Sequence, residues 1–340
     1  MITNAENITL PEHLAAVPAL LGYMPADMIA VVFLRAGRVS MVVDVELEQG
    51  RAGISHHLAR LARHHHMDSV RILVIASTRT AGAALRMADA IAERQEFFGI
   101  TVGGYAYTHQ LARGASYTDQ LRQIDGIIPD PAATAAAVAA VIDGHIILPG
   151  RADYAASFLE RPEPSYMQFI AADRDAAHPG FNAATLGRLA RTIAANAQPS
   201  TDLAARTAVL SLHRDARNAL FGLALIDTRA AAQLYTSIGN TLRGHQRAHM
   251  LAVAAVLYYL TGQGIASYEA TNHADDAARA ARRALIDADA DPIGQTPELV
   301  RVMQTAHAHA IPVDLVRNIL AAGQIAAAKF GIETPGFDTE

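Results

Sequence analysis

Residues 70–76 read Val70-Arg71-Ile72-Leu73-Val74-Ile75-Ala76, a nearly continuous apolar run that predicts a strand buried on both faces. Apolar residues on either side recur at helical spacing, over 54–67 before the run and over 81–98 after it. Gly99 ends the second helix, and residues 100–107 predict another strand. This order of strand, helix and strand favours a sheet with some parallel pairing, covered by helices.

The residues before this segment add a helix and a hairpin. Residues 11–21 predict a short helix, and residues 28–34 a buried strand. Ala36-Gly37 predicts the turn into a strand over 38–47, in which apolar and acidic residues alternate. Residues 113–131 predict an irregular loop with a short strand, and residues 132–142 a helix. We therefore expect an α/β domain over residues 1–155, a mixed sheet flanked by helices.

The remainder of the chain shows only helical spacing. Pro162-Glu163-Pro164 predicts a linker near residues 160–166, so we expect an all-α domain over residues 156–340. Its predicted helices cover residues 183–197, 201–221, 227–239, 245–261, 273–288, 297–309 and 313–330.

Composition limits the functional classes. The chain has 340 residues and no cysteine, which removes disulfides, thiolate nucleophiles and thiolate metal sites and indicates a cytoplasmic protein. Its net charge of −5 argues against nucleic acid as a partner. The most apolar window, residues 250–260, is too short to cross a membrane, and the first residues carry no signal-peptide pattern.

Several segments are similar to the DUF4192 family of actinobacteria and their phages. They are residues 13–27 (HLAAVPALLGYMPAD), residues 144–151 (GHIILPGR), Arg214-Asp215, residues 257–264 (LYYLTGQG), Asp291-Pro292 and Ile311-Pro312. The resemblance runs in order along most of the chain and implies a shared fold, but the family has no established activity. Tryptophans and cysteines that family members often carry are absent here. Any metal site that those cysteines form in relatives is therefore absent too.

One acidic segment has the spacing of a calcium loop. Asp287, Asp289, Asp291 and Glu298 stand at positions 1, 3, 5 and 12 of such a loop. The sixth position requires a glycine for its sharp turn, and here it is Pro292, whose φ is fixed near −65°. We therefore favour the end of a helix followed by a proline turn.

The histidines also argue against a metal. His245 and His249 have the spacing of zinc ligands on a helix, but Arg247 between them would repel a metal ion. A second group over residues 56–66 is interspersed with arginines and predicts a solvated helix face, with contact to nucleic acid or another anion as the alternative. Gly262-Gln263-Gly264 lacks the third glycine and the preceding strand of a dinucleotide site. We expect neither a metal nor a cofactor.

Two functional hypotheses remain open. The favoured one is a binding or assembly protein that forms a homo-oligomer or captures a small ligand. The other is an enzyme acting on a small anionic substrate, phosphorylated or nucleotide-like, at the domain junction. The candidate ligand-binding residues are Asp27, Ser116, Tyr117, Arg151, Arg214 and Asp215. We expect Arg214, Asp215 and Arg217, on one helix, to form a buried or interfacial ion-pair network.

Overall fold

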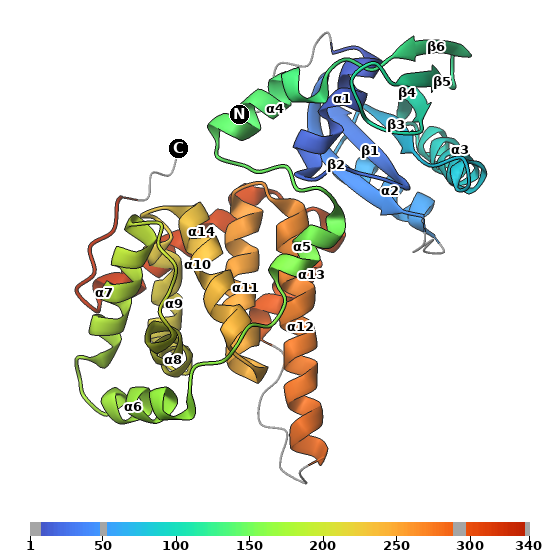
Figure 1. The fold of residues 1–340 in the computed structure, drawn as a ribbon. Coiled ribbons are helices and arrows are strands. Elements are labelled where there is room, and N and C mark those ends of the chain that lie inside the picture. Colours follow the sequence, from blue (N-terminus) through green and yellow to red (C-terminus); the bar gives the residue numbers. More distant parts are fainter. Residues whose placement is uncertain (1–7, 48–52, 288–296, 337–340) are drawn as a thin grey trace. The chain divides into compact units, whose positions relative to one another are not determined.

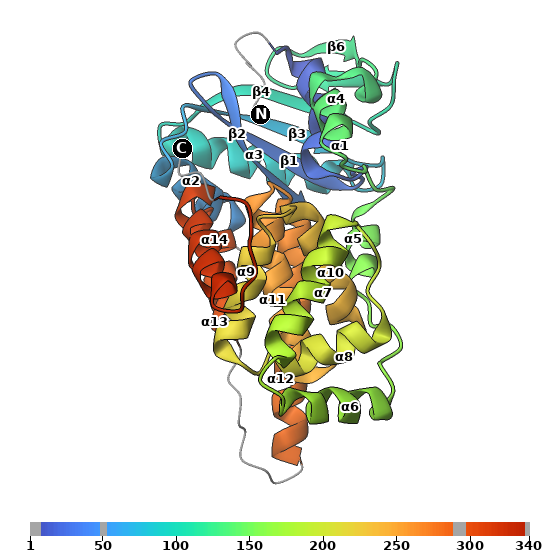
Figure 2. The same cartoon turned by 90° about the vertical axis from the view of Figure 1, so that its left-hand side faces the viewer.

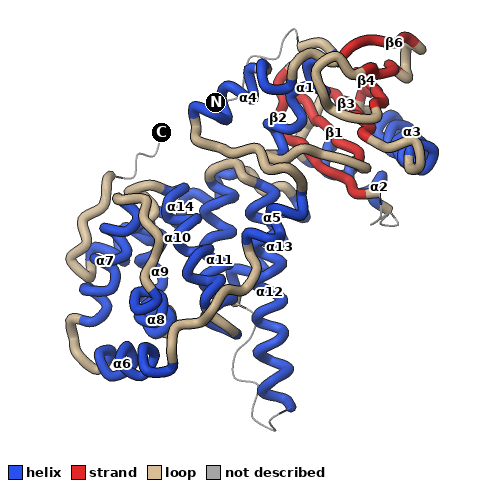
Figure 3. Tube along the Cα trace, viewed as in Figure 1, coloured by secondary structure: helices blue, strands red, loops and turns tan. Residues whose placement is uncertain are grey.

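A computed structural model describes residues 8–47, 53–287 and 297–336. Internal contacts divide the chain into two compact units, Met1–Asp153 and Tyr154–Glu340. The strands gather in the first unit and the second contains helices throughout its described residues (Figures 1 and 3). The expected fold class, a mixed sheet flanked by helices followed by a helical region, is confirmed.

The sheet of the first unit has six strands in the order β2-β1-β3-β4-β5-β6. These are β1 (Met28–Arg35), β2 (Arg38–Glu46), β3 (Ser69–Ile75), β4 (Thr101–Thr108), β5 (Ser116–Asp119) and β6 (Ile124–Ile127). The apolar run at residues 70–76 forms β3, which pairs with β1 on one side and with β4 on the other. Its central position explains why every residue from Ile72 to Ile75 is buried.

The pairing directions bring several strand ends to one edge. β1 is antiparallel to both β2 and β3, whereas β3 and β4 are parallel. Strands β2, β3 and β4 therefore run in the same direction, and their carboxyl ends meet at one edge of the sheet. β1 and β5 start at that edge, because Met28 pairs with Ile75, and Tyr117 with Thr108. We call it the carboxyl edge.

Helices cover both faces of this sheet (Figure 2). α2 (Ile54–His64) and α3 (Ala81–Phe97) pack together on one face, where their apolar side chains meet Ile29, Val31 and Phe33 of β1. α1 (Leu10–Leu21) and α4 (Ala135–Ile142) lie together on the other face. The alternation of side chains along β1 thus supplies one apolar surface to each helical layer.

The second unit is built around helix α11. Its helices are α6 (Tyr166–Ala176), α7 (Phe181–Ala194), α8 (Thr201–Leu210), α9 (Arg214–Leu223), α10 (Thr228–Thr241), α11 (Gly244–Leu260), α12 (Gly264–Asp287), α13 (Glu298–His309) and α14 (Val313–Ala328). Every residue of α11 from Met250 to Tyr258 is buried, because α10, α12, α13 and α14 all pack against it. No helix among the described residues is long and apolar enough to cross a membrane.

Several sequence-based boundaries were wrong. Residues 113–131, expected to be mainly irregular, supply the hairpin β5–β6. The helix expected over 201–221 is two helices, α8 and α9, and α12 begins at Gly264, earlier than expected. The short helices α5 (Arg151–Ser157) and α6 were not expected at all. Between α8 and α9 the chain turns at Ser211, whose hydroxyl donates to the carbonyl of Ala208, with no glycine or proline to signal the break.

Candidate functional site

The carboxyl edge carries a fixed carboxylate at Asp27. This residue precedes β1 and adopts the left-handed conformation (φ 49°), which aspartate tolerates better than most side chains. Its Oδ1 accepts a hydrogen bond from the backbone N–H of Ser77 at 2.9 Å and another from the Thr80 hydroxyl. Both donors belong to the turn between β3 and α3. Asp27 therefore connects the start of β1 to the end of β3.

The electrostatics of this turn keep Asp27 ionised. The hydrogen bond from Thr80 lowers the pKa of the Asp27 carboxyl most, followed by the bond from the Ser77 N–H, and the nearby charge of Arg79 lowers it further. Arg79 is exposed and forms no ion pair with Asp27. The guanidinium of Arg79 thus acts on the Asp27 carboxylate through its charge and not through an ion pair.

Tyr107 and His109 form a second polar pair, at the end of β4. The Tyr107 hydroxyl lies 3.4 Å from the carbonyl oxygen of Ala76, to which it donates, and 2.8 Å from Nδ1 of His109. Burial raises the pKa of Tyr107. Its hydroxyl and Nδ1 of His109 share a hydrogen bond whose donor depends on the tautomer of the ring, and this bond orients the imidazole at the edge.

A third polar group lies on the α1 face of the same edge. Tyr23 donates to Oδ2 of Asp44 at 3.0 Å, and Arg151 forms ion pairs with Asp44 and, at 2.8 Å, with Glu46. Burial, followed by the charge of Asp44, raises the pKa of the Tyr23 phenol. Two carboxylates therefore neutralise the Arg151 guanidinium.

This network also joins distant parts of the sequence. Leu148 donates to the carbonyl of Gly22 at 2.9 Å and accepts from the N–H of Met24 at 2.8 Å, which makes a parallel bridge opposite Tyr23. Residues 13–27 and 144–151, which carry the family resemblance, thus meet beside the sheet.

The structure brings the candidates of the first unit to one edge. Ser116 and Tyr117 begin β5, and the Thr108 hydroxyl donates to the carbonyl of Ser116 at 2.9 Å. The Tyr117 ring lies so close to Gly126 that a Cβ atom there would be 2.5 Å from the ring. Asp27 and Arg151 lie at the same edge, on opposite faces of the sheet.

The two remaining candidates belong to the second unit. Arg214 and Asp215 begin α9 and are exposed, and Oδ2 of Asp215 lies 3.3 Å from Nζ of Lys329 in an exposed ion pair. The buried ion-pair network expected for Arg214, Asp215 and Arg217 is therefore not present within the unit.

Sequence reasoning missed five residues of the edge: Ser77, Arg79, Thr80, Tyr107 and His109. Each of them follows or ends one of the two strands predicted at residues 70–76 and 100–107. Residues just beyond the carboxyl ends of parallel strands commonly line ligand sites. That rule was the available signal, but it required knowing that these strands are parallel neighbours.

The metal candidates gain no further ligands. His249 lies 3.4 Å from Arg217, and burial together with that positive charge lowers the pKa of His249 to about 4. Across the described part of the chain, no group of three or more histidine, aspartate or glutamate side chains could hold a metal ion. Asp289, Asp291 and Pro292 of the calcium-like segment lie outside the described residues.

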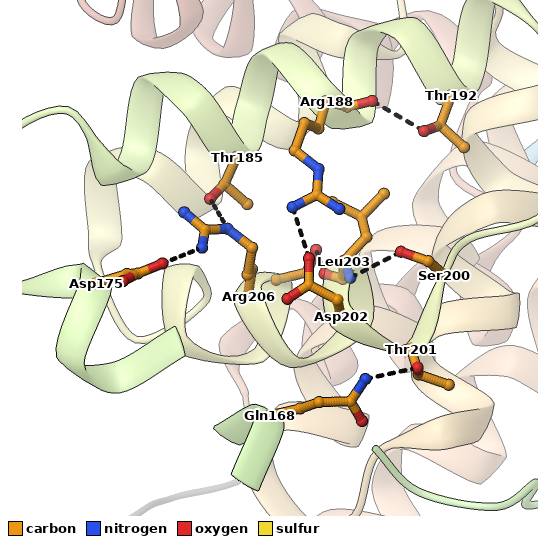
Figure 4. Close-up of polar contacts among 11 residues, drawn as sticks. Gln168, Asp175, Thr185, Arg188, Thr192, Ser200, Thr201, Asp202, Leu203 and Arg206 are labelled. Atoms are coloured by element: carbon orange, nitrogen blue, oxygen red, sulfur yellow. Dashed lines mark hydrogen bonds and ion pairs between the residues drawn. The ribbon is translucent and has the colours of Figure 1, made fainter. Parts of the chain in front are cut away.

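Polar side chains of α6, α7 and α8 bind one another (Figure 4). Arg206 pairs with Asp175 at 2.5 Å and packs over the ring of Phe181, and Arg188 pairs with Asp202 at 2.6 Å. These contacts link three helices and leave the charges paired. We therefore assign them a structural role.

Residues 11–284 match the family model described as "Domain of unknown function (DUF4192)". The chain belongs to the DUF4192 family. The matched region includes the whole sheet and both segments that meet at the Tyr23–Leu148 bridge. No curated protein and no solved structure matches the chain.

Proposed function

We propose that this DUF4192 chain is a cytoplasmic protein that binds a small polar ligand at the carboxyl edge of its sheet. The observation that carries the proposal is the position of Asp27, Ser77 and His109, which stand at the ends of three neighbouring strands, two of them parallel. The crevice outside the carboxyl ends of parallel strands is where open α/β sheets commonly bind ligands. The cysteine-free composition supports the cytoplasmic location.

The charges at the edge favour binding over the alternative of an enzyme with an anionic substrate. Arg151, the cation that we expected to hold such a substrate, is already paired with Asp44 and Glu46. The start of α3 is where a bound anion would be stabilised, but the donors there, the Ser77 N–H and the Thr80 hydroxyl, already bind the carboxylate of Asp27. Asp27 also makes no contact with His109, so the two do not form a charge-relay pair.

A thermal-shift screen of the purified chain against polar metabolites tests the proposal. A ligand present at 100 times its Kd should stabilise the folded protein by about 2.7 kcal/mol and raise Tm by several degrees. Asp27→Asn should abolish this shift. Asp143→Asn removes an exposed carboxylate of the same unit away from the edge and should leave the shift unchanged. A library that stabilises neither protein, or stabilises Asp27→Asn equally, would contradict the proposal.

A second proposal, self-association, is favoured by the free edge of the sheet. β6 is the last strand, and the side chains of Ile124 and Ile127 are 53% and 69% exposed. An apolar edge strand is a template for pairing with another chain. Light scattering should give the wild-type chain a mass above the monomer mass of 36.1 kDa. The double variant Ile124→Lys/Ile127→Lys should have the monomer mass. The control Ile146→Lys, which changes an isoleucine that is 77% exposed outside β6, should keep the higher mass. A monomeric wild-type chain would refute self-association.

A further inference from the structure

We infer that the ligand of the carboxyl edge is a small zwitterion of the amino-acid type, held by its ammonium group at Asp27 and by its carboxylate at Arg79. The inference rests on the proposed function and adds the chemical class of the ligand. It follows from how the exposed Asp27 carboxylate is held and from the exposed Arg79 guanidinium in the same turn.

Asp27 is prepared to accept a cation. Two hydrogen bonds, from the Ser77 N–H and the Thr80 hydroxyl, go to Oδ1, and the Ser77 hydroxyl also interacts with the carboxylate, so its plane is fixed. Oδ2 accepts neither of these two bonds, and the side chain is exposed. An oriented, exposed carboxylate loses little conformational entropy on binding an ammonium group.

Arg79 supplies the opposite charge at the same turn. It lies between Ser77 and Thr80, the two residues that contact Asp27, so its backbone position is fixed relative to the carboxylate. Its guanidinium is exposed and has no partner among the described residues. Guanidinium groups bind carboxylates in a planar, bidentate manner, so Arg79 suits the carboxylate of such a ligand.

His109 offers a third contact on the far side of Ser77. The N–H of Ala76 donates to the carbonyl of Thr108 at 3.0 Å, so the ends of β3 and β4 are hydrogen-bonded to each other. Ser77 and His109 are the residues that directly follow this pair. Asp27 and His109 are two strand spacings apart, about 10 Å at roughly 4.8 Å per strand. Because Nδ1 is engaged by Tyr107, Nε2 is the ring nitrogen that can hydrogen-bond a polar group in the side chain of the ligand.

Ligands with a single charge fit less well. A simple anion at Arg79 would meet the negative charge of Asp27, and a simple cation at Asp27 would meet the positive charge of Arg79. A zwitterion satisfies both groups at once.

The experiment uses the full chain and isothermal titration calorimetry with each of the common free L-amino acids. For any that binds, the matching amide, which lacks the carboxylate, and the matching N-acetyl derivative, which lacks the ammonium, are titrated next. Each change should weaken binding at least about 10-fold, equivalent to about 1.4 kcal/mol. Asp27→Asn and Arg79→Gln should each weaken binding of the parent amino acid by a similar factor, whereas Arg86→Gln, on the exposed part of α3, should not.

The outcomes separate this inference from the proposed function. If no amino acid binds but another polar metabolite stabilises the chain in an Asp27-dependent manner, the ligand class is wrong and the binding site stands. Equal affinity for an amino acid and its N-acetyl derivative would also overturn the zwitterion. If no compound of either set binds, both proposals fail. Circular dichroism of each variant shows whether lost binding reflects lost folding.

Discussion

At the scale of single residues, Arg247 stands out as a buried cation that acts through carbonyl groups. Its side chain is only 3% exposed. The guanidinium donates hydrogen bonds to the carbonyls of Phe158 at 2.5 Å and Gly239 at 3.0 Å. The side-chain amide of Asn240 donates to the carbonyl of Ser157 at 2.7 Å. Together these groups fasten the segment before Pro162-Glu163-Pro164 to helices α10 and α11. Arg247, which we expected from the sequence to repel a zinc ion, thus anchors this segment to the helices.

Arg247→Leu should destabilise the second unit by about 3 kcal/mol, because it leaves the buried carbonyl of Phe158 without its donor and removes one of the two donors to the carbonyl of Gly239. Urea denaturation followed by circular dichroism measures the change. Arg282→Leu alters an exposed arginine of α12 and should change stability by less than about 0.5 kcal/mol. Equal midpoints for Arg247→Leu and the wild-type chain would show that Arg247 is not an anchor.

At the scale of elements, α9 and α14 approach each other backbone to backbone. A Cβ atom on Gly222 would lie 2.4 Å from the carbonyl oxygen of Gly323, and one on Gly323 would lie 2.4 Å from the nitrogen of Gly222. Neither glycine has a positive φ, so close packing is the reason for both. Two facing glycines let the helices make a contact that larger residues would prevent.

Gly222→Ala should therefore destabilise the docking of α14 by about 2–3 kcal/mol, since backbone atoms cannot move aside as a side chain can. Amide hydrogen exchange over residues 313–328 should become faster. Gly187→Ala, in helix α7, is the matched control. A Cβ atom on Gly187 would meet only side-chain atoms, at 3.7 Å or more. Unchanged exchange in Gly222→Ala would contradict the close approach.

At the scale of the whole molecule, both units contain histidines that fold in the neutral form. Burial lowers the pKa of His307 to about 4, and burial together with Arg71 does the same for His13. His249 is held near 4 by burial and Arg217. In the unfolded chain their pKa returns to about 6.5. The unfolded state therefore binds more protons between these two values.

Stability should fall as the pH drops from about 6.5 to about 4, by roughly 3 kcal/mol for each of the three histidines, and these groups should change it little above pH 7. Denaturation midpoints at a series of pH values measure the slope. His307→Gln, which keeps a polar partner for Ser267, should reduce the loss, whereas the exposed His178→Gln should not. A slope unaffected by His307→Gln would assign the acid sensitivity to other groups.

The sequence alone predicted the elements whose signal lies in consecutive residues. The spacing of apolar side chains placed the strands at 28–34, 38–47, 70–76 and 100–107 and most of the helices, because burial of one face repeats with the period of the element. It failed for the hairpin β5–β6 and for the break between α8 and α9. Gly126 opposite the Tyr117 ring and the turn at Ser211 depend on neighbours rather than on a local pattern.

The site required the tertiary structure. Asp27 and Arg151 were singled out from the sequence, but Asp27 finds its partner Ser77 50 residues away and Arg151 finds Asp44 107 residues away. Only the order and direction of the strands decided that Asp27, Ser77 and His109 stand at the ends of neighbouring strands. Apolar periodicity is encoded locally, whereas the meeting of polar groups depends on which distant segments pair, and that is a property of the folded chain.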